Sequence, residues 1–148
     1  MRKIINHWDE EHGVTRCVLN YTTPAGILLQ GIGIAECHPE DAEFMSELTG
    51  SMIAEYRAEI DLIKKINNYE IKPAIVALKH VYCTMRHSKR YNEKSYEAIR
   101  LKKELAHLMD ELEENKLAIK DIKHNLNQYI DKKDKLYKDI RNRTKTNN

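Results

Sequence analysis

The side chains that could bind a transition metal form two groups: Cys37 with His38, His7 and His12, and the helically spaced trio His80, Cys83 and His87. Zinc prefers three or four such ligands at close spacing, often including a pair of cysteines two residues apart. Neither group contains that pair, and a long helical hairpin would hold the two groups apart. We therefore expect no metal and no other cofactor, and we expect Cys83 to be buried in a helical seam.

The same residues offer little for catalysis. A cysteine nucleophile needs a positioned base, and side chains adjacent in sequence, such as those of Cys37 and His38, usually point apart. The Gly31-Ile-Gly33 doublet fits only the start of a dinucleotide fingerprint, because Glu36 occupies the third glycine position and no strand–helix–strand unit follows. We expect no catalytic residues and no enzyme, and we interpret residues 31–41 as a structural corner.

Basic and aromatic residues concentrate at one polar break in the chain. Residues 86–94 hold four lysines or arginines against one acid, with Tyr91 among them and Tyr82 nearby. This combination suits a phosphate-rich ligand or an acidic protein surface. The alternative interpretation is a polar loop whose charge serves solubility.

The first part of the chain has the pattern of β-strands. Residues 14–21 are rich in β-branched and aromatic types, residues 22–26 have turn chemistry, and residues 27–35 form a returning apolar segment. We expect a β-hairpin over 14–35, to which residues 3–5 add a strand. Its two glycines, at 31 and 33, indicate either a β-bulge or close packing by a large group, for which Trp8 is a candidate.

Helical spacing begins at the corner. Pro39 suits a first helical position, and the acids after it suit the positive end of a helix dipole, so we expect a helix to open at residues 38–39. Apolar residues then recur at helical intervals from Phe44 to Ile66. Asn67-Asn68 and Pro73 interrupt this pattern.

Pro73 either kinks one long helix or starts a second one. The apolar face expected after it consists of Ile75, Val76, Leu78, Val81 and Tyr82. The pattern stops at 86–92, and Asn92 or Ser95 is expected to cap the next helix.

The last helix carries the clearest periodic signal. Its apolar positions alternate in steps of four and three, and the pattern predicts a coiled-coil seam of Leu101, Leu105, Leu108, Leu112, Asn115, Ile119, Ile122, Leu126, Tyr129, Lys133, Leu136 and Ile140. Only Asn115 and Lys133 interrupt it. A polar residue in such a seam often fixes the register and the partner number.

Length and charge favour an antiparallel helical hairpin. The stretches 40–87 and 93–142 are similar in length and are joined by a short polar break. Residues 40–61 hold seven acids and one arginine, whereas 132–145 hold seven bases and two acids. Folding back near residue 90 places these segments side by side, and it brings the acids of 110–114 towards Lys64, Lys65 and Lys72.

The fold class expected is therefore mainly helical with a small N-terminal β-hairpin. We predict a β-hairpin module over 1–38, a helical hairpin over 39–142 with breaks near 67–73 and 87–94, and a flexible basic tail over 143–148. A single helical hairpin leaves apolar surface uncovered, so a homo-oligomer is expected.

Composition excludes several classes of protein. The net charge of +2 is too small to indicate nucleic-acid binding by itself. No apolar run reaches the roughly 20 residues of a membrane span, and residues 1–13 lack the apolar core of a signal peptide. Three cysteines without framework spacing favour reduced thiols and a cytoplasmic location.

A family resemblance lies in residues 33–58. The pattern Gly33-x-Ala35-x-Cys37-x-Pro39-x-Asp41, followed by Gly50, Ala54 and Arg57-Ala58, resembles small uncharacterised proteins encoded by bacteriophages and prophages of Gram-positive bacteria. The resemblance covers about a third of the chain, with a looser likeness in the lysine-rich C-terminal helix. It implies an accessory factor that binds host proteins or host immune signals, and it implies no activity.

The leading hypothesis is a self-associating phage protein that counteracts a bacterial host defence by binding. It would block a host effector protein, or sequester a nucleotide signal at a subunit interface through Arg57, Arg86, Lys89, Arg90 and Tyr91. The alternatives are a scaffolding coiled coil of the phage particle and a nucleic-acid-binding accessory protein that uses the basic break and tail.

Overall fold

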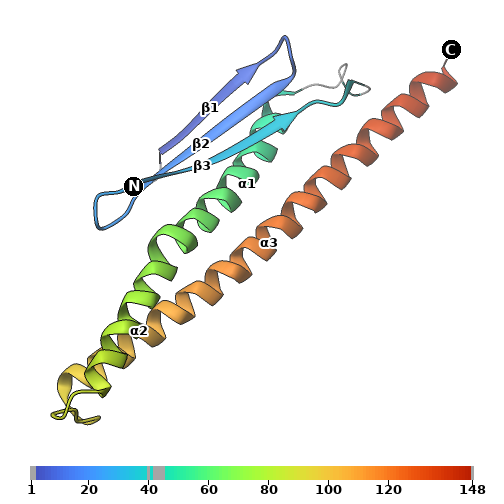
Figure 1. The fold of residues 1–148 in the computed structure, drawn as a ribbon. Helices are drawn as coiled ribbons and strands as arrows, with labels where there is room; N and C mark the ends of the chain where they lie inside the picture. Colours follow the sequence, from blue (N-terminus) through green and yellow to red (C-terminus); the bar gives the residue numbers. More distant parts are fainter. Residues whose placement is uncertain (1–2, 40, 42–45, 148) are drawn as a thin grey trace.

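The computed structural model describes residues 3–39, 41 and 46–147 of the chain. Three strands, β1 (Lys3–Asp9), β2 (Val14–Thr22) and β3 (Leu28–Glu36), are followed by a helical arm and then by one long helix, α3 (Tyr96–Thr146). Figure 1 shows the sheet on one side of the helical arm and α3 on the other. The expectation of a mainly helical chain with a small N-terminal sheet is confirmed.

The sheet is antiparallel with the order β1-β2-β3, so residues 3–5 do belong to an added strand. Side chains alternate between its two faces. Cys17, Leu19 and Leu29 are buried on one face, and that face packs against the first helix of the arm. In the turn between β2 and β3, Gly26 has a φ of 83° and its N–H donates to the Thr23 carbonyl oxygen at 2.9 Å.

The glycines of β3 allow a helix to approach the strand closely. A Cβ at Gly33 would collide with the Ala54 carbonyl oxygen, and a Cβ at Gly31 would collide with the Ala58 carbonyl oxygen and Leu62. Close packing at these glycines is therefore confirmed.

The prediction that Trp8 packs against these glycines was wrong. Trp8 does not fill the space above Gly31 and Gly33, because the backbone of the helical arm lies there. The Trp8 ring instead lies near Gly50, at 3.3 Å from the position that a Cβ would take. A helix backbone in contact with a strand needs small residues on both sides, whereas an indole ring would need a cavity.

The predicted helix start at 38–39 was partly wrong, because Pro39 and Asp41 belong only to a short 3₁₀ turn and the long helix begins later. Helix α1 spans Glu47–Ile66, and its N-cap Ser46 accepts a hydrogen bond from the Thr49 N–H at 3.4 Å. At the corner, the N–H of Asp41 donates to the His38 carbonyl oxygen at 2.9 Å, which closes a short turn. A serine that caps exposed amide groups outweighs a favourable proline here. The expected helical contribution of Phe44 and Met45 lies outside the described residues.

The arm continues without a gap past the predicted interruption. A π-helical turn, η2 (Asn67–Ile71), follows α1 directly and leads into α2 (Lys72–Arg86). Within it the Lys72 N–H donates to the Asn67 carbonyl oxygen, five residues back. Such a turn accommodates Pro73, which lacks the N–H of a regular helical ladder. Of the two alternatives for Pro73, the structure shows one long arm.

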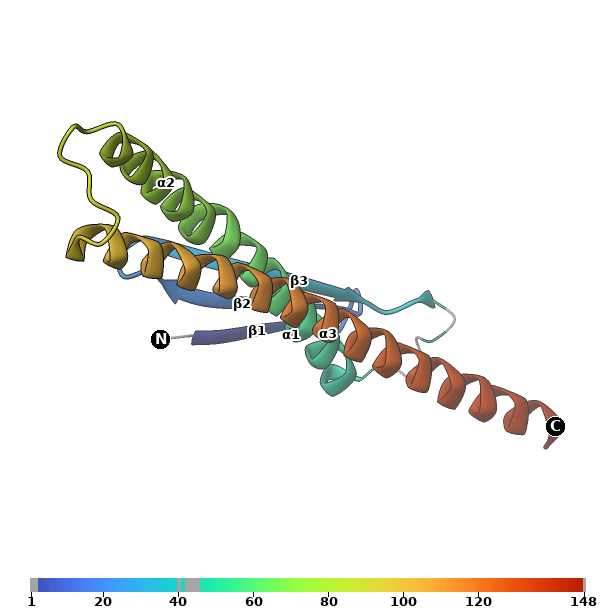
Figure 2. The same ribbon diagram turned by 90° about the horizontal axis from the view of Figure 1, so that it is seen from below.

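The break at the end of the arm lies where it was predicted. Helix α2 ends at Arg86 and α3 begins at Tyr96, with Ser95 as its N-cap accepting from the Ala98 N–H at 3.3 Å. We call residues 87–95, with the helix ends that flank them, the tip. From the tip, α3 runs back beside α2 and α1 in the opposite direction, as Figures 1 and 2 show.

The predicted seam of α3 faces the arm along much of its length. Leu105, Leu108 and Leu112 pack against the buried core, and Leu126 is itself buried. The ring of Tyr129 lies 6.4 Å from that of Tyr56 in α1. Towards the end of α3 the seam opens, and Leu136 is 47% exposed.

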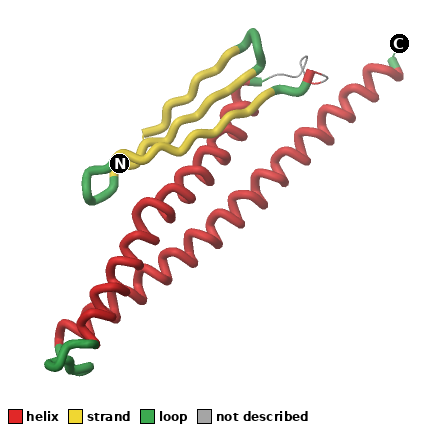
Figure 3. The backbone as a smooth tube through the Cα atoms, viewed as in Figure 1, coloured by secondary structure: helices red, strands yellow, loops and turns green. Residues whose placement is uncertain are grey.

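The polar residue of the seam has a partner. Asn115 donates from Nδ2 to Oδ1 of Asn67 at 2.8 Å, and Asn67 is only 5% exposed. This hydrogen bond joins the π-helical turn to the middle of α3. It fixes the alignment of α3 along the arm, because a one-residue slip would leave a buried amide group without a partner. Figure 3 shows the arm as one continuous helical tube beside α3.

The charge arrangement was predicted correctly at one end, whereas at the other end Lys65 and Lys72 have partners within the arm. Arg141 pairs with Asp41 at 3.0 Å, which joins the basic end of α3 to the acidic corner. Lys65 pairs instead with Asp61 in its own helix, and Lys72 donates to Asn68. Partners one turn away on the same helix are always within reach, so they compete with partners across the seam.

Cys83 was expected in the seam and is exposed. The side of α2 that faces α3 consists of Ile75, Leu78, Tyr82 and Met85, all at least half-buried. The predicted apolar face of α2 was therefore partly wrong. Val76 and Val81 are 67% and 48% exposed.

Candidate binding pocket at the corner

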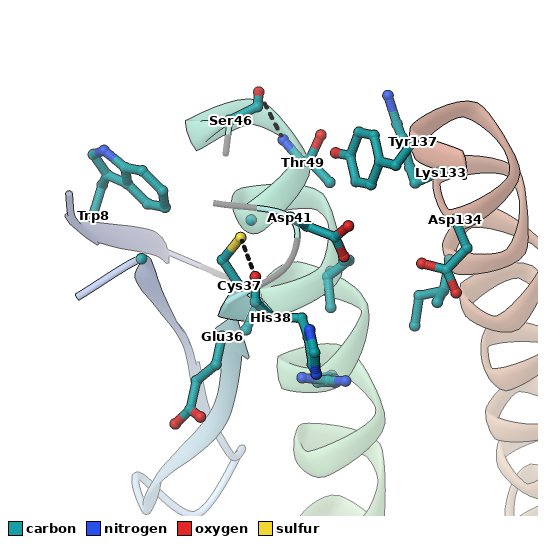
Figure 4. Close-up of a pocket in the computed structure, with 16 residues that line it drawn as sticks. Trp8, Glu36, Cys37, His38, Asp41, Ser46, Thr49, Lys133, Asp134 and Tyr137 are labelled. Atoms are coloured by element: carbon teal, nitrogen blue, oxygen red, sulfur yellow. Dashed lines mark hydrogen bonds between the residues drawn. The ribbon is translucent and has the colours of Figure 1, made fainter. Parts of the chain in front are cut away.

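A pocket opens where the end of the sheet, the start of α1 and the last turns of α3 meet. Its volume is about 190 Å³, and its walls come from residues as distant in sequence as Trp8 and Tyr137. Figure 4 shows the two sides, with Cys37, His38 and Asp41 at the corner and Lys133, Asp134 and Tyr137 on α3. Residues 31–41, which we interpreted from the sequence as a structural corner, therefore contribute to the lining of this pocket.

The lining combines aromatic and charged groups. Trp8 and Tyr137 contribute aromatic rings, Arg57 and Lys133 contribute cations, and Glu36, Asp41 and Asp134 contribute acids. Asp41 is held by Arg141 and is largely covered, with its side chain 18% exposed. The charge of one of the three acids is thus already neutralised. The charges of the other two acids are balanced by the two cations.

Cys37 is not activated as a nucleophile. Its Sγ lies 3.5 Å from the backbone carbonyl oxygen of His38, as Figure 4 shows. Burial raises the pKa of the Cys37 thiol, and the nearby Asp41 carboxylate raises it further. Cys17 is fully buried in the core, and burial raises its pKa to about 11, with a contribution from Glu55. Both thiols therefore favour the protonated, unreactive form.

Arg57 links the pocket to the edge of the sheet. Its guanidinium donates to the Ile34 carbonyl oxygen on β3. One turn further along α1, Asp61 accepts from the Ile32 N–H at 2.8 Å, and Lys65 donates to the Gln30 carbonyl oxygen at 2.7 Å. These three side chains follow the outer edge of β3, and they satisfy backbone groups that a further strand would otherwise bind.

The tip carries the other predicted residues. Tyr91 shares a hydrogen bond of 3.3 Å with Tyr82, and the Arg86 guanidinium lies over the Tyr82 ring at 5.8 Å. This hydrogen bond lowers the pKa of Tyr82 and raises that of Tyr91 to about 12. Lys89 and Arg90 are exposed.

One chain does not bring the five predicted ligand residues together. Arg57 lies on α1 beside the sheet, whereas Arg86 lies 29 positions later at the end of α2. At 1.5 Å per residue this separation is about 40 Å. The tip and the pocket are therefore separate sites within one copy.

The sequence contained one unused signal for the pocket. Lys133 interrupts the apolar seam of α3, and its Nζ lies 5.6 Å from the centre of the Tyr129 ring beside the pocket. Trp8, Asp134 and Tyr137 gave no such signal, because their approach depends on how α3 is placed relative to the end of the sheet.

Three further findings bear on function. Among the described residues, no group of three or more histidines, cysteines or acids is placed to hold a metal ion. None of the helices in this part of the chain is both long and apolar enough to cross a membrane. No protein-family model, curated protein or solved structure matches the chain.

Proposed function

We propose that the chain is a non-enzymatic binding protein, encoded by a bacteriophage, that counteracts a bacterial host defence by holding a nucleotide signal. The observation that supports this most is the corner pocket. Its aromatic rings suit a base, and Arg57 and Lys133 suit phosphate. The thiol of Cys37 in its lining favours the protonated form, so binding without conversion is the chemistry that the pocket supports best. The phage origin and the defence role follow from the family resemblance.

A thermal-shift experiment tests the ligand. AMP, ATP and cyclic di-AMP are the probes, with adenosine and inorganic phosphate as the two half-ligands. A ligand at a hundred times its Kd stabilises the folded chain by about 2.7 kcal/mol, which for a chain of this size raises Tm by roughly 5 to 10 °C. We expect at least one nucleotide, and neither half-ligand alone, to give a shift of this order.

A matched pair of variants locates the site. Lys133→Gln should abolish the nucleotide-dependent shift, because it removes a cation from the pocket wall. Lys120→Gln, an exposed lysine elsewhere on α3, should keep it. Equal shifts in both variants would place the nucleotide elsewhere, and no shift with any nucleotide would contradict the ligand class.

A plating experiment tests the role. Expression of the chain in bacteria that carry a nucleotide-signalling defence should restore plating of a sensitive phage, and Lys133→Gln should restore it much less. Restoration by a chain that binds no nucleotide would favour the host-effector hypothesis instead.

A further inference from the structure

The two edges of the sheet differ in how their backbone groups are satisfied. Strands β1 and β3 each have β2 as their neighbour in the sheet, so each presents a row of N–H and C=O groups on its outer side. On β3 that row binds Arg57, Asp61 and Lys65 of α1. Figure 1 shows β1 at the other margin of the sheet. Within the described part of the chain, no side chain covers the outer row of β1 at Asn6 or Trp8 in this way.

The hydrogen-bond pattern of the sheet determines which residues of β1 face outward. Gly13 and Cys37 continue the register of β2 on β3, and the Cys37 N–H donates to the Gly13 carbonyl oxygen at 2.9 Å. In an antiparallel pair, hydrogen-bonded positions alternate along each strand. The odd-numbered residues of β2 therefore bond to β3, and its even-numbered residues bond to the odd-numbered residues of β1. The backbone groups of positions 4, 6 and 8 consequently face the open edge.

The sequence of β1 complements itself when two copies run antiparallel. Pairing Asn6 with Asn6 of a second copy gives every residue of the seven-residue strand a partner, and it matches outward-facing positions with one another. The same register sets Lys3 opposite Asp9 at both ends of the pair, and it sets Ile4 opposite Trp8. Opposite charges at directly opposed positions stabilise a strand pair. A shift of two residues in either direction shortens the overlap and loses both pairs of Lys3 with Asp9.

We propose that two copies of the chain form a two-fold dimer through antiparallel pairing of their β1 strands, with the axis at Asn6. Each matched pair of outward-facing positions then exchanges two backbone hydrogen bonds, and the two three-stranded sheets become one continuous sheet. The axis is perpendicular to the sheet, so both copies carry α1 on the same face. The contact is self-complementary, as two-fold interfaces are.

The contacts already present at β1 leave room for this pairing. The Asn6 side chain donates to Oε1 of Glu55 at 2.8 Å, so the dimer uses only the backbone groups of Asn6 at the axis. Asp9 is bonded to His12 at 2.8 Å, but its side chain is 40% exposed and a carboxylate can accept from a second donor. Helix α1 packs mainly on β2 and β3.

Backbone hydrogen bonds, more than buried area, stabilise a pair of this kind. A seven-residue strand is about 24 Å long. Pairing along so short an edge buries less surface than a standard specific interface does. The dimer should therefore exchange with the monomer, and its population should depend on protein concentration in the micromolar to submillimolar range.

The dimer also places the partner beside the corner pocket. Trp8 lines that pocket, and its backbone groups face outward on β1. The start of the partner's β1 therefore runs along the wall that Trp8 forms. This placement follows from the register and does not depend on which ligand the pocket binds.

Solution mass tests the dimer. In sedimentation equilibrium from micromolar to submillimolar concentration, the wild type should approach twice the chain mass of 17.4 kDa. Asn6→Pro removes the N–H at the axis, and an edge strand tolerates proline, so this variant should stay monomeric with unchanged circular dichroism. Asn6→Ala keeps that N–H and should dimerise like the wild type. A wild type that stays monomeric throughout, or a fully dimeric Asn6→Pro chain, would overturn the proposal.

Charge reversal tests the register. Lys3→Asp sets acids opposite Asp9, and Asp9→Lys sets lysines opposite Lys3, so each variant alone should dimerise at least several-fold more weakly than the wild type. In an equimolar mixture of the two variants every base again lies opposite an acid, and the mixture should recover the wild-type dimer.

Glu10→Lys is the control for charge reversal, because Glu10 lies just beyond the end of β1. This variant should dimerise like the wild type, and it should not restore the dimer when it is mixed with Lys3→Asp. A mixture of Lys3→Asp and Asp9→Lys that dimerises no better than either variant alone would contradict the proposed pairing. None of these measurements involves a ligand, so they decide the dimer independently of the proposed function.

Discussion

Gly31 and Gly33 of β3 meet Ala54 and Ala58 of α1 at backbone distance. The sequence predicted that a group must pack closely against these two glycines, but it did not predict which group does so. Two glycines in a strand predict a close approach wherever they occur. Which group approaches depends on the direction of α1, and that direction is set by contacts far away in sequence.

A single methyl group tests this contact. Gly33→Ala places a Cβ against the backbone of Ala54 and Ala58, which cannot move without shifting α1. We expect the free energy of unfolding to fall by about 3 kcal/mol or more, as measured by urea denaturation monitored by circular dichroism.

Gly26→Ala is the control for that substitution. Its φ of 83° strains any residue with a Cβ, but no atom lies within 4 Å of the added group. The expected loss is about 1 kcal/mol. Equal losses at the two positions would show that backbone strain, and not the contact with α1, determines the cost.

Among the elements, β3 is an edge strand whose outer backbone groups bind side chains of α1. Arg57, Asp61 and Lys65 lie one turn apart, so a single helix face matches alternate residues of the strand. The spacing of these charges was visible in sequence. Their partners were not, because charges at intervals of four normally indicate pairs within one helix.

Removing the central acid should weaken this edge. Asp61→Ala leaves the Ile32 N–H without its acceptor and Lys65 without its ion pair at 2.8 Å. We expect a loss of about 1 to 2 kcal/mol in the free energy of unfolding and faster aggregation on warming. Lys64→Ala, at an exposed neighbour, should change neither quantity in denaturation and light-scattering measurements. Matching behaviour of the two variants would contradict the role of Asp61.

At the scale of the whole molecule, the periodicity of the apolar residues predicted the helical arm, the long C-terminal helix α3 and the tip between them. It did not predict the pocket. Each element can be inferred from a window of neighbouring residues, but the pocket depends on how three elements meet. Arg141 and Asp41, which pair beside it, are 100 residues apart. Opposite net charges indicated that these ends would approach without indicating a cavity there.

Two leucines of α3 test the packing of the arms. Leu112 packs against the core, so Leu112→Asp buries a carboxylate and should cost about 3 kcal/mol or more, with loss of helical signal. Leu117→Asp should cost less than about 0.5 kcal/mol, because Leu117 is 60% exposed. Thermal unfolding followed at 222 nm measures both, and a stable Leu112→Asp chain would contradict the packing of α3.

The pocket wall on α3 also has a thermodynamic consequence. Beyond Leu126 no described residue of α3 is buried, yet Ile130, Lys133, Asp134 and Tyr137 form that wall. Detaching the last turns of α3 exposes little apolar surface and leaves the sheet and α1 in place. Local unfolding of this kind needs much less free energy than global unfolding. Fraying of the end of α3 would therefore open this pocket, and amide hydrogens after residue 126 should exchange sooner than those of α1.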